Sequence, residues 1–315
     1  MRFDLTVLGS NGALPGPRRY PSGHFLRTEA QDVLIDCGEG TQMRLQQAGL
    51  GIGRVARILI THLHGDHYFG LPGLLTSLAL QGRQSPLTIV SPPGLRARIA
   101  PLLELDRYGL PFPLRFAEYA TTEWTCIHAD AQLEIFAFPL RHRIATNGYL
   151  IREAAREPNL RKAALRRYGI PWQVMDEIKA GAGYVTPEGV HIPHEKLVTP
   201  AAPPRSYAYC SDTVAFPQLS DYVRGVDLLY HEATFLSDME GEAAERGHST
   251  AAQAARIARN AGAGRLLLGH FSARYATVAD HEREARRIFP RSYAVRDLQR
   301  YAVPYRGRRA AGEEE

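Results

Sequence analysis

The segment Ile58–His67, with the sequence ILITHLHGDH, constrains the fold and chemistry of this chain more than any other. Its first residues belong to a short, mostly apolar run, Arg57 to Thr61, which predicts a buried strand. Four polar residues come at the end of that strand: His62, His64, Asp66 and His67. An ordinary core could not satisfy so many polar groups within one turn, whereas imidazoles and carboxylates are ligands of Zn²⁺. The segment therefore predicts a metal site on a loop at a strand end.

The spacing of these residues predicts more than one metal ion. His62 and His64 stand two positions apart, so an extended backbone directs both side chains the same way. Gly65 permits a turn that offsets Asp66 and His67 toward a second position. A single histidine is most often an ordinary core or surface residue, but one ion needs only three or four protein ligands. Four clustered ligands, with others downstream, predict two ions.

Length and composition are typical of a globular α/β protein. The 315 residues, of which 44% are hydrophobic, suffice for one large domain or two ordinary ones. The first ten residues, MRFDLTVLGS, predict a strand and not a secretion signal, and no apolar run approaches the roughly 20 residues needed to span a bilayer. Three cysteines without CxxC spacing favour a reducing, cytoplasmic environment: Cys37, Cys126 and Cys210.

Short apolar runs alternate with helical patterns along the chain, which predicts an α/β fold. Strands are expected at Phe3–Leu8, near Phe25, and at Val33–Asp36, Arg57–Thr61, Leu87–Val90, Leu133–Phe138, Tyr207–Cys210, Leu228–Tyr230 and Leu266–Leu268. Helices are expected at Thr41–Ala48, Leu71–Leu80, Ala251–Asn260 and Ala279–Ile288. Strands cluster early in each half, which favours two facing mixed sheets over one doubly wound sheet.

One segment, Glu153–Pro204, breaks this pattern and is predicted to be an insertion between two strands that each carry a metal ligand. Six basic and only two acidic residues lie between Arg152 and Arg167, in a chain of net charge +5. A solvated helix face would account for such charges, and so would a polyanionic partner. The last residues, 306–315, are poor in apolar side chains and predict a disordered tail.

Three further ligand candidates each follow a predicted strand. They are His142 in FAFPLRH, Asp212 in YAYCSDT and His270 in LLLGHFSARY. Each alone is a weak signal, but their common position at strand ends matches that of the first cluster. Two ions require more ligands than that cluster supplies, and a carboxylate such as Asp212 can bridge them.

The HxHxDH motif with the later His, Asp and His resembles the metallo-β-lactamase superfamily. More narrowly, LGSNGALPGPRR, DCGEGTQMRL, HGDHYFGLPGLL, GIPW…EIKAG, YCSDT, LLYHEATF, GHST and GHFSARY resemble the ribonuclease Z family, endonucleases that remove the 3′ trailer of precursor tRNA. The resemblance extends from Leu5 to about Pro290. It implies one domain over residues 1–315 with the α/β metallo-β-lactamase fold, an αββα sandwich of two mixed sheets, and a flexible inserted arm, 153–204, that binds the tRNA.

The resemblance also implies a role for each site residue. One zinc would be held by His62, His64, His142 and Asp212, and the other by Asp66, His67, Asp212 and His270. Asp66 would in addition accept the proton of the attacking water. His248 in GHST and Glu232 in HEATF would form an acid–base pair that protonates the departing ribose oxygen. From the residues alone, His248 could also simply precede a helix cap at Ser249 or Thr250.

Further expectations concern the substrate and assembly. Arg274 and Tyr275 are candidates for contacts with phosphate and the terminal nucleotide, and the arm would contribute Arg161, Lys162, Arg166 and Arg167. The resemblance implies a homodimer with two Zn²⁺ per subunit, with Mn²⁺ as the alternative metal. Two departures stand out: GIPWQV replaces a tip commonly written around GIPPGP, and SDT replaces the commoner GDT.

Two other functions remain open from the sequence. The first is a hydrolase of the same superfamily that acts on a cyclic nucleotide, an aryl sulfate or a small phosphodiester. The second is an inactive RNA-binding scaffold that retains the fold without metal. The basic insertion favours a large RNA substrate over a small one, and the complete ligand set argues against a scaffold.

Overall fold

The computed structural model describes residues 2–16, 19–29, 31–303 and 305, so the predicted disordered tail, 306–315, lies outside the described residues. The chain divides into two compact units. One comprises Met1–Arg152 and Arg205–Glu315, and the other comprises Glu153–Pro204. Among the described residues, no helix combines the length and the apolar character needed to cross a membrane.

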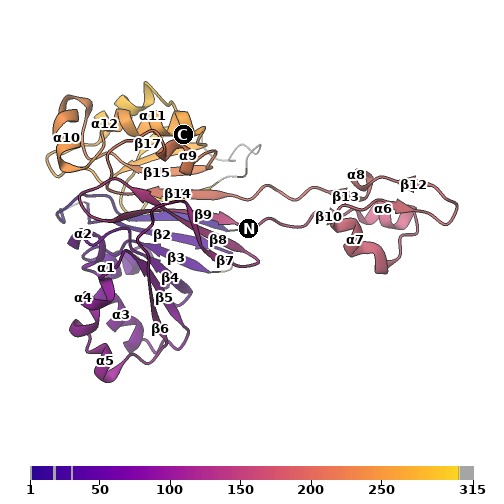
Figure 1. The fold of residues 1–315 in the computed structure, drawn as a ribbon, viewed down its shortest axis with the longest axis horizontal. Helices are drawn as coiled ribbons and strands as arrows, with labels where there is room; N and C mark the ends of the chain where they lie inside the picture. Colours follow the sequence, from indigo (N-terminus) through magenta and orange to yellow (C-terminus); the bar gives the residue numbers. More distant parts are fainter. Residues whose placement is uncertain (1, 17–18, 30, 304, 306–315) are drawn as a thin grey trace. The chain divides into compact units, whose positions relative to one another are not determined.

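The first unit contains two seven-stranded mixed sheets that face each other, with helices on the outer sides (Figure 1). One sheet has the order β18-β1-β2-β3-β4-β5-β6, with β1 Phe3–Gly9, β2 Gly23–Thr28, β3 Asp32–Ile35, β4 Val55–Leu59, β5 Leu87–Ser91, β6 Leu114–Glu118 and β18 Arg300–Ala302. The other has the order β17-β16-β15-β14-β9-β8-β7, with β7 Thr125–Ala129, β8 Leu133–Leu140, β9 Thr146–Glu153, β14 Ser206–Cys210, β15 Leu228–Glu232, β16 Arg265–Gly269 and β17 Ser292–Ala294.

The helices cover the outer faces of these sheets. Those near the first sheet are α1 Thr41–Gln47, α2 Gly65–Tyr68, α3 Leu71–Leu80, α4 Leu95–Leu102 and α5 Leu105–Tyr108. Those near the second are α9 Leu219–Tyr222, α10 Glu240–Arg246, α11 Ala251–Ala261 and α12 Ala279–Arg286, with the short 3₁₀ turn η2 Ser237–Met239. Helix α11 begins with a capping box between Thr250 and Gln253, which satisfies free backbone donors at its first turn.

Successive side chains along a strand point to opposite faces of the sheet, which explains why two cores form. In β2 and β3, Phe25 and Leu34 pack in the core shared with the helices, whereas Leu26 and Val33 pack in the core between the sheets. Strands buried on both faces read as continuous apolar runs, which is why most of them were recognisable in the sequence. The predicted αββα sandwich is confirmed.

The strand directions gather the candidate ligands at one edge. Strands β3 to β6 pair in parallel, as do β14 to β17, so in each sheet the carboxyl ends of these strands lie together. His62 follows β4, Asp212 follows β14 and His270 follows β16. Residues presented from strand ends and the loops after them can therefore meet between the sheets.

The insertion begins differently from expectation. It was predicted to lie between two strands that each carry a ligand, but the strand before it is β9, which carries none of the candidates. His142 precedes β9, in the loop after β8. The sequence of β9, TNGYLIRE, mixes polar and apolar residues and contains glycine, so its strand character was not evident.

The second unit has a small core of its own. Its elements are β10 Asn159–Leu160, α6 Lys162–Arg167, η1 Trp172–Val174, α7 Met175–Lys179, β11 Tyr184–Val185, β12 His191–Ile192, α8 His194–Leu197 and β13 Val198–Thr199. The buried hydrophobic side chains of this core are Ile170, Ile178, Ile192, Leu197 and Val198. The interpretation of 152–167 as one helix face is wrong, because only Lys162–Arg167 is helical and Glu153 still belongs to β9.

Candidate metal centre

Four of the predicted ligands converge into a first group. His64 Nδ1 lies 3.0 Å from His62 Nε2 and 3.3 Å from His142 Nε2. The Asp212 Oδ2 atom lies 3.6 Å from His62 Nε2 and 3.8 Å from His142 Nε2. Donor atoms bonded to Zn²⁺ at about 2.1 Å with tetrahedral angles lie about 3.4 Å apart. The group therefore has the spacing of a tetrahedral metal site with four ligands.

A second group adjoins the first and shares one residue with it. His270 Nε2 lies 3.1 Å from Asp212 Oδ1 and 3.6 Å from Asp66 Oδ2. His67 Nε2 lies 3.4 Å from the same Asp66 oxygen and 3.5 Å from Asp212 Oδ1. Each oxygen of Asp212 thus belongs to a different group, which is the arrangement of a bridging carboxylate.

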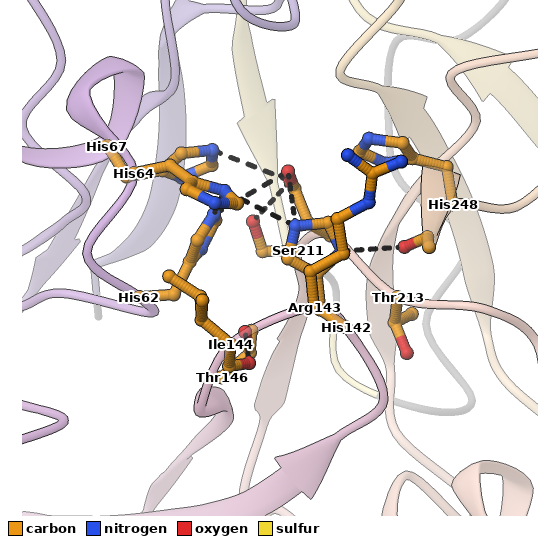
Figure 2. A network of polar contacts seen from close by, with 12 residues as sticks. His62, His64, His67, His142, Arg143, Ile144, Thr146, Ser211, Thr213 and His248 are labelled. Atoms are coloured by element: carbon orange, nitrogen blue, oxygen red, sulfur yellow. Dashed lines mark hydrogen bonds and ion pairs between the residues drawn. The ribbon is translucent and has the colours of Figure 1, made fainter. Parts of the chain in front are cut away.

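The unpaired nitrogen atoms of this cluster indicate that it is built for a cation. His67 Nε2 and His270 Nε2 are buried and have no hydrogen-bond partner in the described part of the chain. Three imidazole rings approach one another from one loop, and His142 approaches from the other sheet (Figure 2). Leaving buried polar atoms unpaired is costly, and a bound metal removes that cost.

Hydrogen bonds to the far nitrogens hold several rings in orientation. His142 Nδ1 lies 2.8 Å from the carbonyl oxygen of Gly247, and His270 Nδ1 lies 3.0 Å from Thr234 Oγ1. His67 Nδ1 lies 2.7 Å from Asp36 Oδ2. In each case the Nε2 atom remains free to face the cluster, as is usual for metal-binding histidines.

Asp36 is a functional candidate that sequence reasoning missed. Its fully buried carboxylate accepts hydrogen bonds from the backbone N–H of Thr61 (2.8 Å) and from the hydroxyl of Tyr209 (3.1 Å), besides contacting His67. Its backbone φ is 55°, a left-handed conformation that is uncommon outside glycine. The available signal was its position: Asp36 directly follows β3, the strand next to β4, and opens DCGEG.

Replacing Asp36 with Asn tests this support. The neutral amide accepts a weaker hydrogen bond from His67, and Asn tolerates the left-handed backbone. We expect metal affinity to fall by about 10- to 100-fold, measured by competition with a chromophoric chelator. Asp130→Asn is the matched control, since Asp130 contacts His128 Nε2 at 2.9 Å on the surface. Equal affinities for the wild type and Asp36→Asn would exclude the role.

His248 and Glu232, which were predicted to act as an acid–base pair, lie in contact beside the cluster. Their Nδ1 and Oε1 atoms lie 2.9 Å apart, and Glu232 is fully buried. The same carboxylate accepts hydrogen bonds from the backbone N–H groups of Thr213, Ser249 and Thr234 and from the Thr234 hydroxyl. The carboxylate is therefore fixed in place before it orients the imidazole.

The charge of Glu232 raises the pKa of His248. Burial lowers the pKa of His248, but the charge and hydrogen bond of Glu232 outweigh burial and raise the pKa to about 9. Cations bound nearby would lower that pKa. An imidazole held by a buried carboxylate in this way can carry a proton and donate it.

Comparison with known proteins shows the family of this chain. Two family profiles match parts of the chain: Beta-lactamase superfamily domain over residues 197–271, and Anti-Pycsar protein Apyc1 over residues 3–99. The Ribonuclease Z of Parabacteroides distasonis is 42% identical over 288 residues, covering 91% of this chain and 95% of that protein. The Ribonuclease Z of Porphyromonas gingivalis is 41% identical over 298 residues, covering 95% and 98%. The chain belongs to the ribonuclease Z family.

A solved structure extends this relationship. The short form of human tRNase Z superposes with a TM-score of 0.70 at 29% identity, covering 96% of this chain and 99% of that one. Family membership confirms the prediction of a tRNA 3′-processing endonuclease with His and Asp metal-binding clusters. The assignment of individual site residues stays a prediction.

A cavity of about 1080 Å³ opens over the cluster of this ribonuclease Z family member. Its lining includes His64, Asp66, His142, Asp212, His248 and His270. Arg274 is paired with Glu242, which lines the cavity (Arg274 Nη2 to Glu242 Oε1, 2.8 Å). Tyr275 lines a different cavity, and its hydroxyl accepts a hydrogen bond from the backbone of Leu236. Their role as substrate contacts stays a prediction.

Proposed function

We propose that this chain is a zinc-dependent endoribonuclease that hydrolyses one phosphodiester bond of precursor tRNA, removing the 3′ trailer and leaving a 3′-OH. The observation that carries this proposal is the geometry of Asp212, whose two oxygens each join one group of histidine ligands. Family membership supports the choice of substrate. We also propose that it acts as a homodimer in the cytoplasm.

The donor atoms fit two cations of the zinc type. His62, His64, His142 and Asp212 would hold one, and Asp66, His67, His270 and Asp212 the other. Imidazole nitrogen and carboxylate oxygen suit Zn²⁺, and Mn²⁺ is the alternative metal. When bound, two such cations lower the pKa of a water molecule and neutralise charge on a phosphoryl oxygen.

Asp66 is suited to accept the proton of the attacking water. Its Oδ2 atom accepts a hydrogen bond from the backbone N–H of Ala13 at 2.8 Å and faces His67 and His270. This leaves Oδ1 as the proton acceptor, on a residue that lines the cavity. His248, held at Nδ1 by Glu232, donates the proton at Nε2 to the departing ribose oxygen.

Metal removal and replacement test the proposal. Wild-type protein equilibrated with Zn²⁺ is expected to retain two ions per chain and to lose cleavage of precursor tRNA on treatment with a chelator. Added Zn²⁺ or Mn²⁺ should restore cleavage. His142→Ala and His270→Ala should each lower the ion content, because each removes a ligand of one group only. Fewer than one ion per wild-type chain, with cleavage unaffected by chelator, would contradict the proposal.

We also assign the unit Glu153–Pro204 the task of binding tRNA. Lys162 and Arg166 are exposed and form no ion pair with any described residue, while Arg167 lies over the ring of Tyr168. The side chain of Arg161 donates a hydrogen bond from Nε to the carbonyl oxygen of Val198, which fixes its position. Exposed cationic groups on a compact unit suit a phosphate backbone.

Charge removal on this unit gives a direct test. Replacing Arg161, Lys162, Arg166 and Arg167 with Gln should weaken tRNA binding and reduce its salt dependence. Each lost phosphate contact removes about 0.7 to 0.9 units of slope in a plot of log affinity against log salt. Turnover of a small phosphodiester should not change, and Arg224→Gln, at an exposed arginine of the other unit, serves as the control. A parallel loss with the small diester would show that these residues support the fold instead.

A further inference from the structure

Besides the candidate ligands and His248, the cavity is lined by charged and by apolar side chains. The charged residues are Glu39, Arg143, Glu242, Glu245 and Arg246. The apolar residues include Leu14, Pro15, Pro21 and Phe69. A phosphodiester needs cations and hydrogen-bond donors, so the apolar part must have a different purpose.

Phe69 is exposed although it packs against the segment His62–His67, which carries four of the candidate ligands. Its side chain is 62% exposed, while its backbone N–H donates to the carbonyl oxygen of Gly65 at 2.9 Å. A Cβ atom on Gly65 would lie 2.2 Å from the ring of Phe69, so the ring fills the space that a side chain at this position would take. Gly65 separates the ligands His64 and Asp66. The ring is therefore held directly beside the metal cluster, with the rest of its surface open.

Leu14 occupies a comparable position on the neighbouring loop and is 63% exposed. The residue before it, Ala13, donates its backbone N–H to Asp66 Oδ2, and a Cβ atom on Gly12 would lie 2.8 Å from the ring of His270. The loop that carries Leu14 is thus fixed against two predicted ligands. Two exposed apolar side chains therefore adjoin Asp66 from different loops.

Exposed apolar surface beside a reaction centre marks a binding site for an apolar part of the ligand. The base is the flat apolar part of a nucleotide, and aromatic side chains stack on unpaired bases with little dependence on sequence. We infer that Phe69 and Leu14 form a binding site for the nucleobase of a nucleotide adjoining the cleaved phosphate. This inference rests on the proposed function, since it requires an RNA substrate.

The test combines protein variants with modified substrates. Phe69→Leu keeps an apolar side chain against Gly65 but removes the aromatic face, whereas Phe69→Trp retains an aromatic face. Precursor tRNA is prepared with an abasic nucleotide immediately 5′ or immediately 3′ of the cleaved bond. The values of kcat/KM, metal content and oligomeric state are measured for each protein. Leu80→Ala is the control, because Leu80 is 84% exposed at the end of α3 and away from this lining.

On intact substrate we expect kcat/KM to fall about tenfold for Phe69→Leu, within the range that base–aromatic stacking contributes, and to change little for Phe69→Trp and Leu80→Ala. For the wild type, kcat/KM should fall by a similar factor on one of the two abasic substrates. For Phe69→Leu, kcat/KM should not fall further on that substrate, because the interaction is already absent. Leu14→Ala should show the same coupling to a smaller degree, with metal content unchanged.

The inference would be overturned if Phe69→Leu and each abasic substitution lowered kcat/KM by factors that simply multiply when the two changes are combined. It would also be overturned if Phe69→Leu altered the oligomeric state while the abasic substrates were cleaved normally, since the surface would then join two copies of the chain. A wild-type protein that fails to cleave intact precursor tRNA would instead count against the proposed function. The two failures are therefore distinguishable.

Discussion

Asp66→Ala is expected to abolish hydrolysis while leaving the fold and tRNA binding largely intact. The side chain belongs to the second group of metal ligands and is the proposed proton acceptor, so one substitution removes both contributions. Loss of a general base alone typically lowers turnover by about 100- to 10,000-fold, so we expect at least a hundredfold decrease in kcat at saturating Zn²⁺. Single-turnover cleavage of precursor tRNA is the measurement.

Two controls separate chemistry from structure in this experiment. Binding of tRNA, measured by filter retention, should change little, because the RNA contacts proposed for the unit Glu153–Pro204 do not involve Asp66. Asp106→Ala removes an exposed carboxylate paired with Arg96 and should leave turnover unchanged. Near-normal turnover of Asp66→Ala in the presence of zinc would remove this residue from the mechanism.

The second large effect concerns the leaving group. His248→Ala should lower cleavage of RNA, whose ribose alkoxide departs poorly without a proton, by about 100- to 10,000-fold. A diester with a nitrophenyl leaving group needs no proton for departure and should be affected far less. The structure is consistent with this acid role, since His248 lines the cavity and its Nδ1 atom is hydrogen-bonded to Glu232.

Glu232→Gln should show the same selectivity in milder form, because the imidazole remains but loses its charged partner. The substitution also places an amide where several N–H and O–H donors converge, so its melting temperature must be measured alongside. His128→Ala, outside the cluster, is the control. Equal losses on both substrates would assign His248 to support of the fold or of the metal ligands, and would withdraw the acid role.

The fold and the ligand cluster were largely predictable because both depend on apolar strands. Strands β4 and β16 each contain a short apolar run, and ligand candidates follow the ends of both strands. Helix α3, Leu71–Leu80, has the predicted bounds. The half-exposed strands β6 and β7 were not predicted, because their residues neither form an apolar run nor alternate clearly.

Side-chain partners were less predictable, because they depend on how distant segments pack. Asp36 contacts His67 only because β3 and β4 are neighbours and the backbone at Asp36 is left-handed. Arg274 and Tyr275 were predicted from their nearness to His270 in the sequence. In the structure Arg274 pairs with Glu242, and Tyr275 lines another cavity. Phe69, which the sequence does not distinguish from a core residue, is exposed beside the cluster.

The most direct test of the account is to map the new 3′ end when zinc-loaded protein cleaves a precursor tRNA labelled at its 5′ end. We predict a single product that ends at the 3′ boundary of the tRNA body with a free hydroxyl, formed by wild type but not by Asp66→Ala. With a second precursor labelled at its 3′ end, the released trailer should appear as one intact fragment. A ladder of shortened products, or no cleavage of precursor tRNA while a small diester is still hydrolysed, would contradict the assignment of this chain as a tRNA 3′-processing endonuclease.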